Sequence, residues 1–301
     1  MRTQIKNEVE NMALKLITDS ATDLPRGYAQ EHNIHVIPTP VVIDGQDHRD
    51  GVTIFPEDFY RQLRSGCDVA TYHINQFMFT EAFEPYAKAG DSVIYFCFST
   101  GIAGTFNAAN NAKSDLLETY PDFDLTIIDS KCASIGFGLS VMYLVDLYEK
   151  GATKETLIKA ADFYFNHMEH IFTVETLEYL YKGGRIKRPA AIAGTLLDLK
   201  PLIEVTDEGT LTSFEKVRGR NKSLKRLVDL VGERAWNPSA QKFGLVHGDC
   251  ADDLHRVRDQ ITEKYGVTDF VESYVGCAIG AHTGPGIIGI TFLDAEPPKF
   301  M

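Results

Sequence analysis

Residues 92–105 read SVIYFCFSTGIAGT, an apolar run that ends in a short polar loop. The apolar residues 93–98 are typical of a buried strand, and residues 102–120 have the pattern of an amphipathic helix. Similar strands are predicted at residues 14–18 and 125–129, again with a helix in the chain that follows. Strands and helices that alternate at this spacing predict a parallel sheet with helices on both faces.

The loop between this strand and this helix has the composition of an anion site. Gly101 and Gly104 allow the backbone to approach a ligand closely. The hydroxyls of Ser99 and Thr100 lie beside a helix start, where backbone N–H groups have no partner within the helix. The residues therefore predict either an anion-binding loop or an ordinary capped helix start. The segment lacks the lysine of a nucleotide-binding P-loop.

The second half of the chain has a different pattern. A helix is expected over residues 154–168, and residues 200–205 and 211–217 read as strands around Asp-Glu-Gly, which predicts a hairpin. Further strands are expected at residues 242–247, 269–274 and 286–292. We predict a two-domain α/β protein, with an N-terminal parallel-sheet α/β/α domain and a C-terminal α+β domain with a mostly antiparallel sheet. The predicted boundaries are an N-terminal extension at 1–12 and domains at 13–165 and 166–301.

Composition narrows the functional classes. The 301 residues have a formal net charge of −12, which argues against nucleic acid as a partner. No segment approaches the roughly 18 consecutive apolar residues of a membrane span, although transient contact with a membrane surface is compatible with the sequence. The five cysteines are widely spaced and contain no CxxC pair, so we expect neither a disulfide framework nor a zinc site, and a cytoplasmic location.

Two further segments carry candidate site residues. In residues 280–286, two glycines around a proline predict a tight turn beside His282 and Thr283, with Gly284 shaping it. The alternative for His282 is that it is a structural or merely exposed residue, as most lone histidines are. Residues 19–25 follow the first strand, and Ser20 is expected to shape the same sheet edge as the Ser99 loop.

Basic residues stand out in this acidic chain. Arg185 and Lys187 follow two glycines, and Arg218 and Arg220 follow the predicted hairpin. Most charge clusters are solvated faces, but we interpret these four residues as a partner surface.

Taken together, these segments resemble the DegV family of bacterial fatty-acid-binding proteins. The matching segments, which run through nearly the whole chain from residue 14, are residues 17–24, 50–51, 59–60, 99–105, 129–130, 177–186, 200–203 and 282–286. The resemblance implies a two-domain fold with a long-chain fatty acid between and within the domains. It also implies a role in bacterial phospholipid metabolism, in which a non-catalytic carrier presents the fatty acid to a separate kinase that makes an acyl phosphate. No cofactor is expected besides the bound fatty acid.

The resemblance also implies which residues hold the carboxylate. Carried onto this sequence, they are Thr71, Ser99 and His282, with Thr100 and Thr283 nearby. Two departures affect this site. Tyr-His-Ile-Asn at 72–75 replaces the Ser-Gln-Pro-Ser that usually follows the threonine, and Ala103 replaces the usual second serine of the loop. His73 is either a substitute hydrogen-bond donor or an exposed structural histidine.

Two enzyme classes are the alternatives. Ser99 and His282 could serve as nucleophile and base of a hydrolase that acts on a small carboxylic acid or ester, although no third orienting residue and no GxSxG motif is evident. A metal-dependent hydrolase would need a ligand cluster, and the only dense candidate is residues 47–50.

Overall fold

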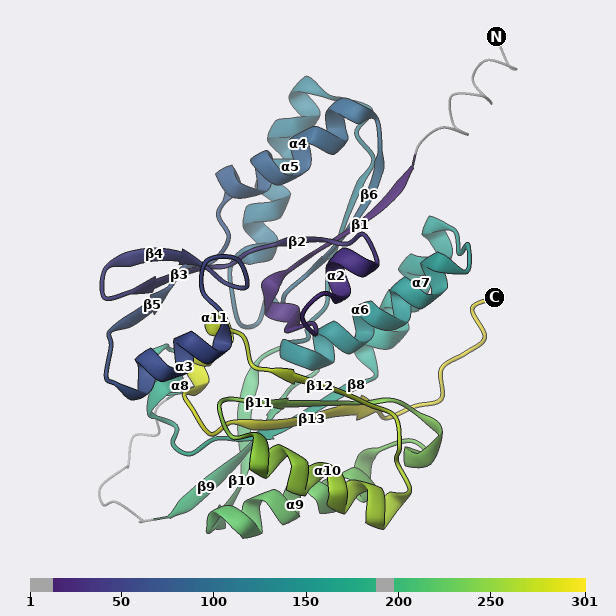
Figure 1. Ribbon diagram of the computed structural model, residues 1–301. Helices are drawn as coiled ribbons and strands as arrows, with labels where there is room; N and C mark the ends of the chain where they lie inside the picture. Colours follow the sequence, from purple (N-terminus) through teal and green to yellow (C-terminus); the bar gives the residue numbers. More distant parts are fainter. Residues whose placement is uncertain (1–12, 188–197) are drawn as a thin grey trace.

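The computed structural model describes residues 13–187 and 198–301, and their strands form three sheets (Figure 1). The expected N-terminal extension, residues 1–12, lies outside the described residues. A four-stranded sheet comes from the first half of the chain and a six-stranded sheet from the second. A small three-stranded sheet lies beside them.

The four-stranded sheet is entirely parallel, as predicted. In sheet order its strands are β2 (His35–Ile37), β1 (Leu14–Asp19), β6 (Ser92–Cys97) and β7 (Leu125–Asp129). Every residue of β6 is buried because the strand is central in the sheet. The carboxyl ends of β1, β6 and β7 meet at one edge, and the Ser99 loop leaves from there.

Helices cover both faces of this sheet (Figure 1). They are α4 (Gln76–Ala89) and α5 (Thr105–Thr119) on one face, and α6 (Ser134–Glu149) and α7 (Lys154–Asn166) on the other. Alternate residues of β6 separate accordingly: Val93 and Tyr95 pack with α4 and α5, whereas Ile94 and Phe96 pack with α6 and α7. This period of two is that of a strand buried on both faces.

The six-stranded sheet is mostly antiparallel, which confirms the prediction for the second half. In sheet order its strands are β10 (Leu211–Arg218), β9 (Leu199–Val205), β8 (Met168–Thr173), β13 (Ile288–Leu293), β11 (Phe243–His247) and β12 (Phe270–Tyr274). Among the described strand pairs of this sheet, only β11–β12 is parallel. Helices α9 (Arg220–Arg234) and α10 (Ala251–Tyr265) cover one face, and α6 contacts the other.

The helix expected over residues 154–168 is shorter than predicted, because strand β8 begins within this range. The helix ends at Asn166, and Met168 already begins a strand in the middle of the sheet. This strand pairs with β9 and with β13. Because both partners lie far along the chain, local periodicity does not distinguish the strand from a helix that continues.

The three-stranded sheet positions two parts of the site. In sheet order its strands are β4 (Gln46–Arg49), β3 (Pro40–Ile43) and β5 (Val69–Thr71), and all its pairs are antiparallel. The remaining elements are η1 (Ser20–Thr22), α2 (Tyr28–Glu31), α3 (Pro56–Arg64), α8 (Glu178–Lys182), η2 (Pro238–Ala240) and α11 (Cys277–Thr283). Helix α11 corrects the turn predicted over residues 280–286: residues 280–283 are helical, and the turn begins only at Gly284.

One apolar core cluster connects the two larger sheets. It contains Leu16 and Phe96 of the parallel sheet, Phe137 of α6, and Phe172 and Leu293 of the six-stranded sheet. Helix α6 therefore packs between the sheets. The predicted boundary at residues 165–166 stays a prediction, but it falls between the last parallel strand and β8. Within the described residues, no helix is both long and apolar enough to cross a membrane.

Candidate functional site

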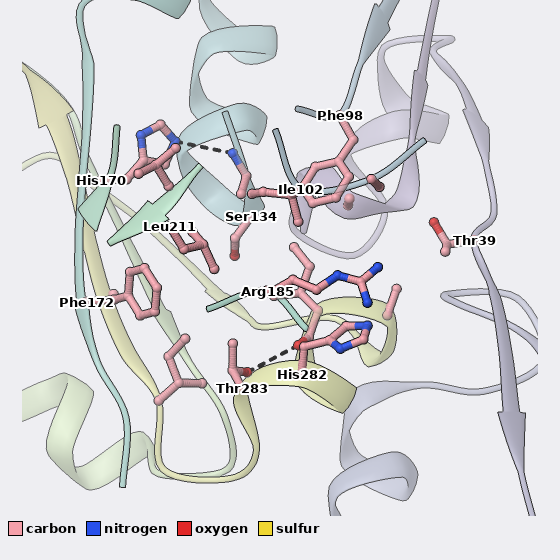
Figure 2. A pocket seen from close by; sticks show the side chains of 18 of the residues that line it. Thr39, Phe98, Ile102, Ser134, His170, Phe172, Arg185, Leu211, His282 and Thr283 are labelled. Atoms are coloured by element: carbon pink, nitrogen blue, oxygen red, sulfur yellow. Dashed lines mark hydrogen bonds between the residues drawn. The ribbon is translucent and has the colours of Figure 1, made fainter. Parts of the chain in front are cut away.

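An apolar cavity lies between the carboxyl edge of the parallel sheet, helix α11 and the inner face of the six-stranded sheet (Figure 2). The space between its wall atoms is about 980 Å³ when the open solvent at its mouth is included. Phe98 and Ile102 contribute to the wall from the first half of the chain, and Phe172 and Leu211 contribute from the second. The cavity therefore needs both halves of the fold.

Polar side chains gather at one end of this cavity. Thr71, the last residue of β5, places its Oγ1 2.6 Å from Nε2 of His282 in the last turn of α11. Gly183 packs against the other ring nitrogen, and a Cβ at this position would lie 2.1 Å from His282 Nδ1. The imidazole thus occupies a defined position that only glycine at 183 permits.

Arg185 lines the same end of the cavity and gives it a positive charge. Its Nη1 donates to the carbonyl of Gly183 at 2.6 Å, so the Arg185 side chain folds back towards the turn at the two glycines. Figure 2 shows the guanidinium beside the His282 ring. In residues 13–187 and 198–301, no carboxylate forms an ion pair with this partly buried guanidinium, whose pKa is lowered by burial.

The electrostatics of His282 follow from this environment. Burial, followed by the nearby charge of Arg185, lowers the pKa of His282 to about 4. The ring is therefore neutral at pH 7 and can donate one hydrogen bond. This end of the cavity carries one guanidinium charge, one imidazole and one hydroxyl, which suits a single anionic group.

A second histidine, His170 of β8, lies in the cavity wall. Its Nδ1 is 2.8 Å from the carbonyl of Met168, and its Nε2 accepts a long, 3.4 Å hydrogen bond from the N–H of Ala133. Burial lowers the pKa of His170 to about 4. The folded protein therefore requires a neutral ring at a position where the unfolded chain titrates near 6.5.

This burial predicts how stability depends on pH. A depressed folded-state pKa means that the stabilisation is complete above about pH 6.5 and is lost as the pH falls towards 4. Between pH 7 and 4.5, the wild type should lose roughly 2 kcal/mol more unfolding free energy than His170→Gln, which cannot titrate. Urea unfolding at both pH values measures this difference. Equal losses in the two proteins would show that His170 is not held neutral.

The structure brings some of the predicted residues together at the cavity. Thr71, His282 and Thr283 line it, and Thr283 Oγ1 donates to the carbonyl of Ile279 at 3.3 Å. His73 also lines the cavity beside Gly104, and Tyr72 is 62% exposed at its mouth. The wall residues described here do not include Ser20, Ser99, Thr100, Gly101, Gly104 or Gly284.

Ser99 is fully buried and is engaged elsewhere. Its Oγ donates to the carbonyl of Gly209 at 2.7 Å and accepts from the N–H of Gly101 at 3.2 Å. A Cβ at Gly101 would lie 2.5 Å from Gly209 backbone atoms, so the tip of the β9–β10 hairpin docks directly on the loop. A role of Ser99 in carboxylate binding stays a prediction, and it requires this contact to open.

The loop N–H groups also have acceptors within the protein. Those of Ile102 and Ala103 donate to the carbonyl of Ser99, and that of Thr100 donates to Asp129. Thr100 Oγ1 donates to the same carboxylate at 2.5 Å. These three N–H groups are therefore not available to an anion in this conformation. The helix itself begins at Thr105 rather than at residue 102.

Ser20 and Gly284, which were expected to shape the site, do not line the cavity and contact neighbouring elements instead. Ser20 Oγ lies 3.0 Å from Thr39 Oγ1 and 3.3 Å from an Asp50 carboxylate oxygen. Gly284 has a φ of 72°, and a Cβ there would lie 2.4 Å from the ring of Tyr179. Its absent side chain allows the turn after α11 to pack against α8.

The four basic residues occupy different environments. Arg185 points into the cavity, whereas Lys187 and Arg218 are exposed. Arg220 Nε lies 2.8 Å from Asp253 and 3.4 Å from Glu175. The sequence contained no signal that separates Arg185 from the other three, because its direction depends on the turn at the two preceding glycines.

The enzyme alternatives find little support in these contacts. Among the described residues, no hydrogen bond joins Ser99 to His282, since the serine bonds Gly209 and the histidine bonds Thr71. The candidate metal cluster at residues 47–50 is dispersed, with Asp50 turned towards α11. In the part of the chain that the structure describes, no three His, Cys, Asp or Glu side chains form a metal-binding group.

Comparison with known families identifies the relationship. Residues 13–295 match the model of a family described as "Uncharacterised protein, DegV family". The chain belongs to the DegV family. A DegV domain-containing protein of Clostridium perfringens is 38% identical to this DegV chain over 286 residues, which is 94% of this chain and 98% of that protein.

Solved DegV structures share the fold. A DegV family protein of Thermus thermophilus, described by its fatty acid binding, is 25% identical with a TM-score of 0.83, over 94% of this chain and 100% of that one. A protein of Eubacterium ventriosum, described as binding stearic acid, is 28% identical with a TM-score of 0.81, over 92% of this chain and 97% of that one. These likenesses confirm the resemblance and the fold class expected from the sequence.

Proposed function

We propose that this DegV protein binds a long-chain fatty acid, with its carboxylate at Thr71, His282 and Arg185 and its acyl chain along the apolar wall. The observation that carries the proposal is an apolar cavity with a partly buried guanidinium at one end, which has no ion-pair partner among the described residues. An apolar chain with one terminal negative charge complements both features. The description of the Thermus and Eubacterium relatives supports the same ligand class.

The energetics favour such a ligand. Burying a chain of about fourteen methylenes contributes on the order of 10 kcal/mol at ~0.8 kcal/mol each, before the cost of association. An unpaired carboxylate in the cavity would cancel much of this gain. The guanidinium, the Thr71 hydroxyl and the neutral imidazole supply donors where that cost would arise.

A titration distinguishes this proposal from simple apolar adsorption. Delipidated protein should bind palmitate much more tightly than methyl palmitate, because the ester keeps the acyl chain but carries no charge. Intrinsic or displacement fluorescence measures both dissociation constants. Equal affinity for the acid and the ester would contradict a charged end to the site.

We also propose that the protein is a non-catalytic carrier that works in the cytoplasm and presents its carboxylate to a separate kinase. Five unpaired cysteines favour a reducing compartment. The exposed cations Lys187 and Arg218 are the candidates for the kinase-facing surface, since Arg185 lies in the cavity and Arg220 is ion-paired.

Reversing these two exposed charges tests the carrier role. In the Lys187→Glu, Arg218→Glu double variant, acyl-phosphate formation by the partner kinase should slow about tenfold or more, because surface charges steer the encounter of the two proteins. Palmitate affinity should stay at the wild-type value. Unchanged acyl-phosphate formation would contradict this surface as the docking site.

A further inference from the structure

Helix α11, which carries His282, is held at both ends by the same small sheet. Asp50 follows β4 directly, and its two carboxylate oxygens accept from the N–H groups of Cys277 at 3.0 Å and Ala278 at 3.2 Å. At the other end of the helix, Thr71 of β5 contacts His282 at 2.6 Å. Strands β4 and β5 both pair with β3, so the two anchors belong to one rigid unit.

At the Asp50 end, the start of α11 packs closely against buried carboxyl groups. Asp50 is 4% exposed, and burial raises its pKa. A Cβ at Gly276 would lie 2.5 Å from Asp23 Oδ1 and 3.1 Å from Asp50 Oδ2, so the helix start fits against two carboxyl groups. Ser20 Oγ lies 3.3 Å from Asp50 and contacts Thr39 on its other side.

A helix as short as α11 depends on such contacts for its orientation. It has seven residues, about two turns, and an isolated helix of this length does not form stably in water. The His282 ring projects from the side of the helix. A small rotation of the helix about its axis would therefore move the ring away from Thr71. Asp50 accepts hydrogen bonds from the first two N–H groups of the helix, and these bonds fix how the helix is rotated about its axis.

We propose that Asp50 is a positioning residue that fixes the rotation of α11 and thereby places His282 against Thr71 at the polar end of the cavity. Asp50 is not among the described residues that line the cavity. It acts through the helix between Cys277 and His282. The proposal rests on the proposed function only for its effect on fatty acid affinity; the position of His282 can be tested without ligand.

Asp50→Asn is the direct test, because asparagine has the same shape but replaces one acceptor oxygen by an amide that repels an N–H donor. Ser20→Ala is the milder second variant, since it removes the hydroxyl beside Asp50 and leaves the carboxylate. Thr153→Ala is the matched control: Thr153 caps the unrelated helix α7 by accepting from the N–H of Thr156. It should lose stability without affecting the site.

Two measurements are made on each folded variant, the pKa of the His282 ring by NMR without ligand and the dissociation constant for palmitate. In Asp50→Asn, a loosened α11 admits water, so the His282 pKa should move from about 4 towards 6.5. Palmitate affinity should fall about tenfold, as expected when one hydrogen-bonded partner is displaced. Ser20→Ala should shift both in the same direction by less, and Thr153→Ala should shift neither.

The outcomes separate the alternatives. A purely electrostatic effect of removing the Asp50 charge would lower the His282 pKa, which is the opposite sign. A lowered or unchanged His282 pKa in Asp50→Asn would overturn the proposal, and if that variant does not fold, the same result in Ser20→Ala would do so. If the wild type binds no palmitate, the proposed function fails, while the His282 pKa still decides the role of Asp50.

Discussion

Replacing Arg185 by glutamate should weaken palmitate binding at least a hundredfold. A charge-assisted hydrogen bond contributes about 1.5–3 kcal/mol, and a negative charge at the same position adds repulsion, so a loss of roughly 3 kcal/mol or more is expected. Arg185 is a partly buried cation at the cavity, and no carboxylate of residues 13–187 and 198–301 forms an ion pair with it. Titration of delipidated protein at pH 7.5 measures the change.

Two matched variants complete this experiment. Arg185→Lys keeps the charge and should retain most of the affinity, and Lys187→Glu reverses an exposed charge two residues away and should retain all of it. If Arg185→Glu binds palmitate like the wild type, the carboxylate does not lie at this end of the cavity.

Replacing Leu211 by tryptophan should weaken palmitate binding by up to about a thousandfold. Leu211 belongs to the apolar wall that the six-stranded sheet contributes, together with Phe172 (Figure 2). An indole in this wall takes the space of several methylenes, and displacing about five of them removes roughly 4 kcal/mol. Octanoate, whose chain is short, should be affected much less.

The ratio of the two affinities is the informative quantity. It should move towards octanoate in Leu211→Trp and stay unchanged in Leu211→Met, which conserves the volume of the side chain. A palmitate-to-octanoate ratio that is the same in Leu211→Trp and the wild type would contradict an acyl chain along this wall.

The fold was largely predictable because its elements carry strong local patterns. The strand at residues 92–97 and the helices around it have clear periodicities, and the hairpin at 206–210 has its turn residues. Strand β8 and helix α11 were missed for a physical reason: both are short and are held by partners distant in the chain. For α11 these partners are Asp50 and Thr71, more than 200 residues away.

The candidate site was less predictable than the fold. Thr71 entered the expected site only through the family resemblance, and its contact with His282 joins segments that no local pattern connects. Arg185 was expected on a surface because charged residues usually are, yet the turn at Gly183 directs it inwards. The Ser99 loop was expected to offer free N–H groups, but those of Thr100, Ile102 and Ala103 already have acceptors within the protein. In addition, the tip of a hairpin from the second half of the chain packs on this loop.

That covered loop suggests how the carboxylate site is divided. In the site that we propose, His282 and Thr71 are already in contact, whereas Ser99 would contribute only if the hairpin tip at Gly209 moved away. A bound carboxylate offers Ser99 a charged acceptor in place of a neutral one.

The most direct test of the central claim is mass spectrometry of what is extracted from the purified protein. We predict a long-chain fatty acid in an amount close to one per chain, reduced in Arg185→Glu and replaced by shorter acids in Leu211→Trp. No extracted fatty acid, together with no binding of any long-chain acid by the delipidated protein, would contradict the account.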